Sequence, residues 1–346
     1  MRKYIKFVTA VSLFVININT ALSSETQHLN INSDWHYFEN NASDLNELRQ
    51  SLNSKTGGWQ SINLPHTWNA FDTVDAIPGY RRSASWYSRD LSSEEINKDG
   101  KTVLYFEGAN YETELYVNGR LVGEHVGGYL GFRFDITDFV NANTDNIVMV
   151  RVSNRYNRNL IPSQKSDFFL FGGITRDVWV EHKPDTYIDR VAISTPKVSH
   201  EKAETKVVAH IDSAISGTAK LQFSLNDPQS KQAISFSKDV TLRAGKNKFS
   251  VSLPILKQPD LWSPDAPNLY TLSSELKMGN DTLHSSSERF GYRWFEMRPK
   301  QGFFLNGARL LIRGTHRHEE HAGLGAALPN EQHRIDMQMI KDITAK

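Results

Sequence analysis

Residues 114–122 read Glu-Leu-Tyr-Val-Asn-Gly-Arg-Leu-Val, which is the pattern of a β-hairpin. Asn118 and Gly119 tolerate the positive φ angles that a tight type I′ turn requires, and apolar residues typical of strands flank them. No long helical period interrupts the neighbouring sequence. Short strands separated by turns indicate a jelly-roll β-sandwich over residues 24–184. Its other clear strands are predicted at residues 102–107, 146–152 and 176–181.

The strand pattern continues beyond Lys183-Pro184-Asp185, which we interpret as a junction between domains. About seven strands over residues 185–293 are typical of a small immunoglobulin-like β-sandwich. The strands that we expect there cover residues 190–194, 206–211, 219–224, 248–253 and 270–276.

In residues 294–346 the strand pattern of the two preceding domains gives way to a strand, a loop and a helix. A hairpin at 302–309 leads into an apolar strand at 310–313, a histidine-rich loop and a helix at 330–342 with Asn330 as its N-cap. Strand, loop and helix make the first unit of a (β/α)8 barrel, and one unit cannot bury its own apolar surfaces. The predicted fold class is therefore mainly β: a jelly roll, an immunoglobulin-like sandwich and the truncated start of a barrel.

The N-terminus has the order of a signal peptide. Basic residues precede a mostly apolar run at residues 7–16, and Ala21 and Ser23 are the small residues of a cleavage site. We therefore expect residues 1–23 to be removed and the protein to be periplasmic or secreted. The run is too short to span a bilayer, and no later segment is apolar enough to do so.

Composition narrows the classes of partner. The 346 residues carry a formal net charge of +1 and contain no cysteine. Disulfides, thiolate metal sites and cysteine nucleophiles are thereby excluded. No basic bias favours nucleic acid or an anionic membrane, so a neutral partner such as a sugar is expected.

Several segments, in order, resemble family 2 glycoside hydrolases of the β-galactosidase-like kind. Thr315 and His316 depart from the Val and Asn that this family often has, which leaves the substrate open. The segments that carry the resemblance are Leu64-Pro-His-Thr-Trp68, Phe106-Glu-Gly-Ala-Asn110, Gly127-Gly-Tyr-Leu-Gly-Phe-Arg-Phe-Asp-Ile-Thr137, Asp167-Phe-Phe-Leu-Phe-Gly-Gly-Ile-Thr-Arg-Asp-Val178, Leu261-Trp-Ser-Pro-Asp-Ala-Pro-Asn-Leu-Tyr270 and Ile312-Arg-Gly-Thr-His-Arg-His-Glu-Glu-His321.

The resemblance implies retaining hydrolysis of terminal β-D-galactosyl residues. β-Glucuronidase and β-mannosidase are alternatives within the family, and a non-catalytic carbohydrate-binding protein is an alternative outside it. Retaining enzymes need two carboxyl groups about 5–5.5 Å apart. By resemblance both would lie beyond residue 346, so we expect this chain alone to be inactive. The complete enzyme would be a homo-oligomer using sodium or magnesium, whereas this chain requires no cofactor.

Three substrate-binding residues follow from the same resemblance. Asp167 would bind the sugar, partly through a sodium ion, although a turn-capping aspartate is the plain alternative. His318 would contact the sugar from the loop after the first barrel strand, beside Glu319. The cluster of His316, Glu320 and His321 is not diagnostic of zinc. Arg176 and Asp177 are interpreted as structural residues at a strand end, leaving His318, Glu319 and Asp167 as the predicted site.

Overall fold

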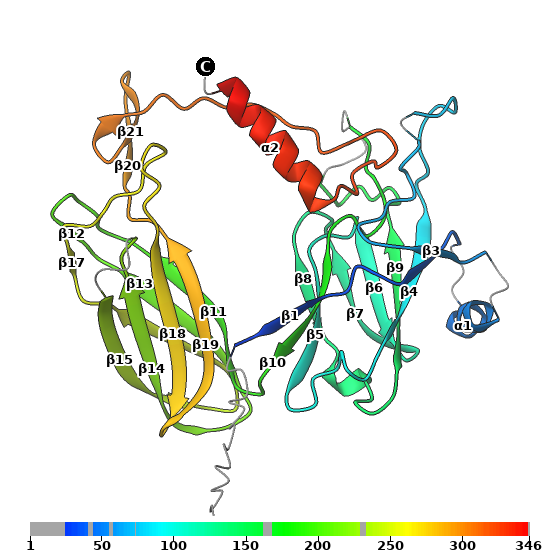
Figure 1. The fold of residues 1–346 in the computed structure, drawn as a ribbon, viewed down its shortest axis with the longest axis horizontal. Helices are drawn as coiled ribbons and strands as arrows, with labels where there is room; N and C mark the ends of the chain where they lie inside the picture. Colours follow the sequence, from blue (N-terminus) through cyan, green and yellow to red (C-terminus); the bar gives the residue numbers. More distant parts are fainter. Residues whose placement is uncertain are drawn as a thin grey trace, which may run out of the picture.

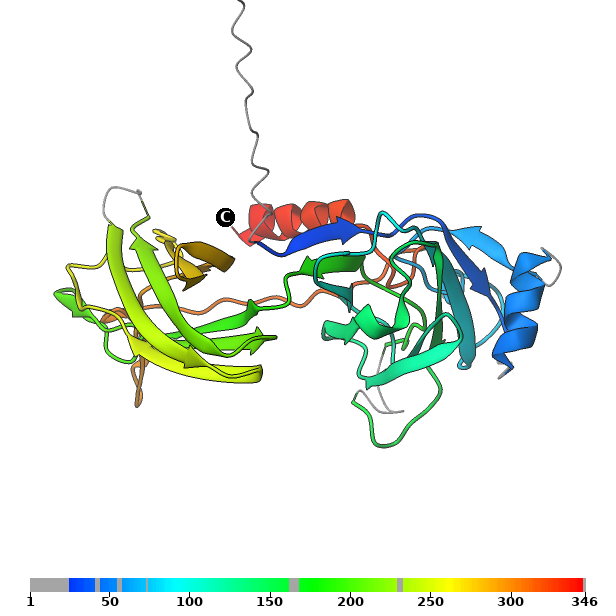
Figure 2. The ribbon, with the colours of Figure 1, turned by 90° about the horizontal axis from the view of Figure 1, so that it is seen from below.

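The structure is a computed structural model that describes residues 25–40, 44–54, 58–72, 74–161, 168–228 and 233–344. Two β-sandwiches lie side by side, and a helix crosses above the space between them (Figures 1 and 2). The mainly β fold class is therefore confirmed. The predicted signal peptide lies outside the described residues. Within the described part, no helix is both long and apolar enough to cross a membrane.

The first sandwich packs two antiparallel sheets. One has the strand order β1 (Gln27–Asn30), β10 (Val178–Lys183), β5 (Lys101–Phe106) and β8 (Phe132–Asp135). The other has the order β3 (Gln60–Ile62), β2 (Trp35–Phe38), β4 (Ala84–Leu91), β9 (Asn146–Ser153), β6 (Glu112–Val117) and β7 (Arg120–Val126), and a 3-10 turn, η1 (Thr137–Phe139), follows β8. Alternate side chains of both sheets face inward and form one apolar core that includes Leu104, Phe106 and Val150.

The predicted hairpin joins β6 and β7, with Asn118 at φ 52° and Gly119 at φ 79°. Helix α1 (Leu45–Asn53) was not predicted. Asp44 caps it by accepting hydrogen bonds from the backbone N–H groups of Asn46 and Glu47. Its Leu48 packs against Trp86 and Met149 on the outer face of the six-stranded sheet. The short apolar stripe was missed because it buries only one side chain fully.

The second sandwich has its own core. One main sheet has the strand order β11 (Tyr187–Ser194), β13 (Lys206–Ser213) and β16 (Gly245–Ser252). The other has the order β15 (Ala233–Leu242), β14 (Gly217–Asn226), β18 (Tyr270–Met278) and β19 (Asp281–Phe290). A small pair, β12 (Lys202–Ala203) and β17 (Leu256–Lys257), closes one end. Along β14, Ala219, Leu221, Phe223 and Leu225 are buried in strict alternation, as a half-buried strand requires.

In the C-terminal region, β21 (Gly302–Leu305) and β22 (Ala308–Arg309) form the predicted hairpin. A strand that was not predicted, β20 (Phe295–Arg298), pairs with β21 and completes a small sheet. Residues 310–313 are not the strand that we predicted. A strand needs a run of hydrogen bonds to a neighbour. The Leu310 N–H donates to the Phe303 carbonyl of β21 at 3.0 Å, but the described residues contain no ladder that continues through 311–313, and Leu311 and Ile312 remain exposed. The segment instead crosses to the first sandwich before α2 (Asn330–Thr344) runs back (Figure 1).

Helix α2 confirms the predicted helix, but its N-cap prediction was wrong. Asn330 is the first helical residue rather than the cap. Its side-chain amide donates a hydrogen bond of 2.9 Å to the Asp177 carboxylate at the end of the first sandwich. Asp177 also accepts one from Asn32 at 2.9 Å. The amide therefore ties the start of the helix to the jelly roll.

Candidate functional site

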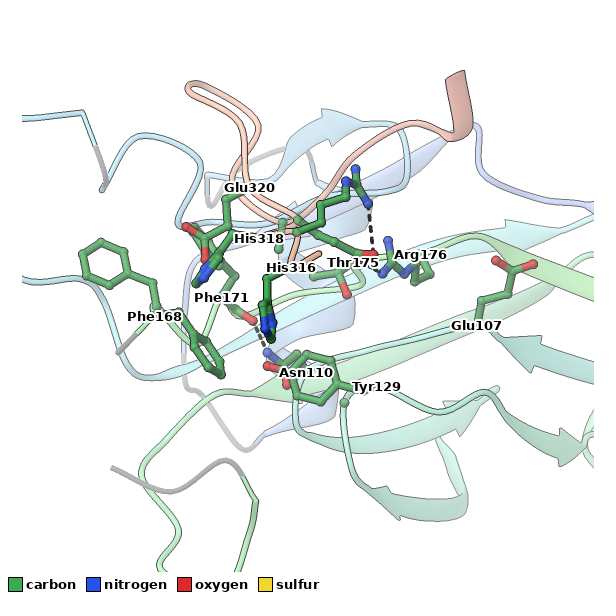
Figure 3. Close-up of a pocket in the computed structure, with 15 residues that line it drawn as sticks. Glu107, Asn110, Tyr129, Phe168, Phe171, Thr175, Arg176, His316, His318 and Glu320 are labelled. Carbon is green, nitrogen blue, oxygen red and sulfur yellow. Dashed lines mark hydrogen bonds and ion pairs between the residues drawn. The ribbon is translucent and has the colours of Figure 1, made fainter. Parts of the chain in front are cut away.

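A pocket of about 370 Å³ opens where the loop at residues 314–326 meets the jelly roll; we call it the junction pocket. Figure 3 shows its side chains, with His316 and His318 on the loop side and Asn110 and Tyr129 opposite. The jelly roll contributes Glu107, Asn110, Gly128, Tyr129, Phe168, Phe169, Phe171, Thr175 and Arg176, and the loop contributes His316, Arg317, His318, Glu319, Glu320 and Ala326.

Close packing holds the jelly-roll wall of the junction pocket. A Cβ atom on Gly172 would lie 2.0 Å from the Trp68 ring, so only glycine lets this backbone pass. The Gly172 N–H donates to the Asn69 side chain at 2.7 Å. The Asn110 amide donates to the Phe171 carbonyl at 2.5 Å. The pocket wall is thus anchored by buried amides rather than by a strand.

The loop at 314–326 also approaches the jelly roll closely. Ala327 and Leu328 just after it are buried, and a Cβ atom on Gly325 would lie 2.8 Å from the Phe171 ring. Gly325 has φ 54°, which also favours glycine. These contacts bring the predicted site loop against the aromatic segment that follows Asp167.

His318 lies in the junction pocket, where its ring and that of Phe168 form a T-shaped pair with centroids 6.2 Å apart and planes at 76°. A neutral imidazole can donate or accept a hydrogen bond, and a neighbouring aromatic ring can pack against the apolar face of a sugar. The structure therefore places His318 at the wall of the junction pocket.

Glu319 lines the same pocket, but its carboxylate is already engaged. One oxygen pairs with the Arg176 guanidinium, and the other lies 3.0 Å from Nη1 of Arg317. Partial burial alone would raise the pKa of Glu319, but the hydrogen bond and charge of Arg176 outweigh it and hold that pKa below its usual value. Glu319 is thus an anionic anchor for the loop.

Glu320 differs from its neighbour. Figure 3 shows it beside His318 at the pocket. Partial burial raises the pKa of Glu320, and the nearby His318 only partly offsets this effect. A carboxyl group at a pocket wall can accept hydrogen bonds from sugar hydroxyls. From the sequence, Glu320 was considered as part of a metal cluster and, with Glu319, as an unsuitable catalytic pair, but not as a sugar-binding residue, because a loop sequence does not reveal which of two adjacent side chains faces a cavity.

His333 on α2 lies between two arginines. Its Nε2 is 2.8 Å from Arg176 Nη1, and its Nδ1 is 3.0 Å from Arg317 Nη1. A neutral imidazole has one acceptor nitrogen, so only one arginine donates to it at a time, and a protonated ring would accept from neither. Burial and the charge of Arg176 lower the pKa of His333, which favours the neutral ring.

Asp167 lies outside the described residues, so its role in sugar and sodium binding stays a prediction. Its neighbour Phe168 lines the junction pocket. Among the described residues, no group of three or more histidine or acidic side chains is arranged to hold a metal ion.

The pocket residue that the sequence did not reveal is Arg176, which we interpreted as a structural residue at a strand end. The sequence feature that could have pointed to Arg176 is its position in the same stretch of the family resemblance as Asp167, residues 167–178.

Comparison with known proteins identifies the family. Residues 27–184 match the model of the glycosyl hydrolases family 2 sugar binding domain, and residues 186–293 match the glycosyl hydrolases family 2 model. The chain belongs to glycosyl hydrolase family 2. The junction pocket thus forms between the family 2 sugar binding domain and the loop that follows the second matched domain.

Individual family 2 relatives support the assignment. A Formosa agariphila protein named "Putative beta-glucuronidase" is 44% identical over 99% of this chain and 41% of its own length. A β-galactosidase of Thermoanaerobacter pseudethanolicus is 31% identical over 90% of this chain and 42% of its own. The chain therefore spans about two-fifths of the length of these curated relatives.

A solved structure extends the comparison to the fold. The β-glucuronidase 2 of Bacteroides uniformis, covalently bound to cyclophellitol-6-carboxylate aziridine, aligns with a TM-score of 0.81 at 31% identity. The alignment covers 92% of this chain and 38% of that one. The arrangement of the two sandwiches is thus that of a known family 2 enzyme.

Proposed function

We propose that this chain forms the sugar-binding front of a retaining family 2 glycoside hydrolase that acts on β-glycosides. The observation that carries the proposal is the junction pocket, where two parts of the chain present aromatic rings beside hydrogen-bonding groups. A pyranose sugar offers both an apolar ring face and hydroxyl groups, which such a lining complements. Within the pocket, His318 and Glu320 contact the hydroxyl groups and Phe168 contacts the ring.

For the sugar itself, β-D-glucuronides are the first candidate. The support is the 44% identity to the Formosa agariphila protein over nearly the whole chain, together with the likeness to the Bacteroides uniformis enzyme. β-D-Galactosides, which the sequence resemblance favoured, are the second candidate, supported by the Thermoanaerobacter pseudethanolicus relative. The two classes differ at C6, where a glucuronide carries a carboxylate, and in the configuration of the hydroxyl at C4.

We further propose that the 346-residue chain binds sugar without cleaving it. Retaining hydrolysis needs an acid/base and a nucleophile on opposite sides of the glycosidic bond, about 5–5.5 Å apart. Glu319 and Glu320 are adjacent in one loop, and the Glu319 carboxylate is held by Arg176 and Arg317. Neither the adjacency of the two residues nor the engagement of the Glu319 carboxylate suits a catalytic pair that must flank a glycosidic bond.

The test compares binding and turnover in the same chain. Isothermal titration with methyl β-D-glucuronide and methyl β-D-galactoside measures binding, and release of 4-nitrophenol from the matching aryl glycosides measures hydrolysis. We expect saturable binding, stronger for the glucuronide, and no hydrolysis. His318→Ala should abolish binding, whereas His210→Ala on β13 of the second sandwich should not. Hydrolysis by the chain, abolished by Glu320→Gln, would overturn the proposal that it is inactive alone.

Residues 1–23 are proposed as an export signal. N-terminal sequencing of the protein recovered from the native cells should begin at Ser24. Recovery of the uncleaved N-terminus from the cytoplasmic fraction would contradict export.

A further inference from the structure

Arg176 is the one residue of the described chain whose guanidinium contacts both the site loop and α2 from the jelly roll. Nη2 pairs with the Glu319 carboxylate, and Nη1 lies 2.8 Å from His333 Nε2. Its aliphatic stem is closely packed, because a Cβ atom on Gly108 would lie 3.0 Å from the Arg176 Cγ atom. The position of this cation is therefore set by the jelly roll.

The loop is held on its other side as well. Arg317 donates from Nε to the Asp336 carboxylate of α2 at 2.9 Å and from Nη1 to Glu319 at 3.0 Å. His318 lies between these two anchored residues, yet its ring faces Phe168 rather than the ion pairs. The ion pairs of Arg317 and Glu319 restrict the backbone segment that carries His318. We therefore expect the orientation of His318 to depend on the ion pairs that hold Arg317 and Glu319.

We propose that Arg176 is a positioning residue for the sugar site: through Glu319 it fixes the direction in which His318 and Glu320 face the junction pocket. The inference rests on the proposed function for its ligand, but the orientation of His318 can be measured without one. Groups held in place before binding lose little conformational entropy when the ligand arrives, so affinity depends on such anchors. The jelly roll would thereby act on the sugar site through a guanidinium that is already paired with Glu319 and His333.

Two readouts in the 346-residue chain test this inference. The first, without ligand, is the nuclear Overhauser effect between the His318 and Phe168 rings, with hydrogen exchange of residues 314–326. The second is the dissociation constant for methyl β-D-glucuronide. For Arg176→Ala we expect loss of the ring contact, faster exchange in the loop and roughly tenfold weaker binding, which corresponds to about one charge-assisted hydrogen bond.

Arg151→Ala is the matched control, because Arg151 pairs with Glu114 within the same jelly roll and lies outside the pocket. It should change neither readout. The exchanged pair Arg176→Glu with Glu319→Arg should recover part of both, which a loss of general stability would not allow. Arg176→Lys keeps the charge without the planar fork and should fall between wild type and Arg176→Ala.

The outcomes separate the two proposals. If the wild-type chain binds neither glycoside, the proposed function fails for this chain, while the ring contact and loop exchange still decide the positioning role. If Arg176→Ala leaves the ring contact and loop exchange unchanged, the positioning role is wrong whatever the affinity. If Arg151→Ala weakens binding as much as Arg176→Ala, the effect is one of stability, which also overturns the inference.

Discussion

At the scale of single residues, His284 links β19 to the junction between the sandwiches. Its Nδ1 accepts a hydrogen bond of 3.2 Å from the Ile188 N–H, so Nε2 carries the proton and donates to Thr26 Oγ1 at 3.2 Å. Burial, assisted by the charge of Lys183, lowers the pKa of His284 to about 4. Burial likewise lowers the pKa of His66, which contacts the Tyr87 hydroxyl in the first sandwich, to about 4.

These two histidines predict a loss of stability in mild acid. The unfolded chain takes up protons near pH 6.5, whereas the folded histidines resist protonation until about pH 4. The free energy of unfolding should therefore fall as pH decreases from about 6.5 to 4, by at most roughly 3 kcal/mol per histidine. Urea unfolding at several pH values measures this, and His284→Gln should flatten the slope for the second sandwich. A folded-state pKa near 6.5 for His284 by NMR would contradict the explanation.

At the scale of elements, the β6–β7 hairpin depends on its turn. The Asn118 amide donates to the Phe139 carbonyl at 2.9 Å and to the Asn146 side chain at 2.8 Å, and its oxygen accepts from the Ile147 N–H at 3.0 Å. Gly119 has φ 79°, and a Cβ atom added to it would meet no atom within 4 Å. Glycine is therefore favoured here by the backbone conformation and not by a lack of space. The two turn residues therefore stabilise the hairpin in different ways.

Asn118→Ala should destabilise the first sandwich by about 2–4 kcal/mol, because it removes several hydrogen bonds and places alanine at a positive φ. Gly119→Ala should cost only about 1 kcal/mol, which reflects conformation without lost contacts. Equilibrium unfolding of both variants gives the ranking. Equal losses would mean that the Asn118 side chain contributes little.

Helix α2 exposes much of its apolar surface. Its apolar side chains Ile335, Met337, Met339 and Ile343 are between 45% and 73% exposed, and an isolated helix of 15 residues is marginal in water. Polar contacts of Arg176, Arg317 and Asp177 hold its first half. This combination of anchored start and exposed apolar surface predicts weak amide protection.

Hydrogen exchange of the 346-residue chain tests this expectation. Residues 331–343 should exchange faster than β9, with protection decreasing towards Thr344. Protection equal to that of β9 would show that contacts beyond those in this structure stabilise the helix. Asp336→Asn, which removes the acceptor of Arg317, should accelerate exchange further, whereas Asp342→Asn near the end of the helix should have little effect.

At the scale of the whole molecule, two separate apolar cores lie in the two sandwiches. Between them the described contacts are mostly polar, such as the ion pair of 3.2 Å from Lys101 on β5 to Asp212 on β13. Because the described residues form no apolar cluster shared by the two domains, each sandwich should unfold as its own cooperative unit.

This arrangement makes core substitutions local in effect. Phe106→Ala in the first core and Phe223→Ala in the second should each cost about 3–5 kcal/mol, because both side chains are fully buried. Exchange protection should decrease only in the sandwich that carries the substitution. A parallel decrease in both would show that the polar junction couples them more strongly than the cores suggest.

Prediction succeeded where structure follows from local pattern. The alternation along β14, the Asn118-Gly119 turn and the apolar spacing of α2 each reflect the repeat of a single element, so a short window of sequence contains them. Predictions failed where an element depends on a neighbour. Residues 310–313 have the composition of a strand but no partner strand among the described residues, and α1 exists because Leu48 finds Trp86 and Met149 on a distant sheet surface.

The sequence by itself determined the two β-sandwiches, their turns and the family, because backbone geometry and short motifs are local properties. Only the tertiary structure decided which site residues act together. It brought Arg176 to Glu319 across 143 residues of sequence and placed Glu320 beside His318 at the pocket. The physical reason is that such contacts depend on how a loop crosses between packed domains, where buried surfaces and charge pairs select one path that no local pattern encodes.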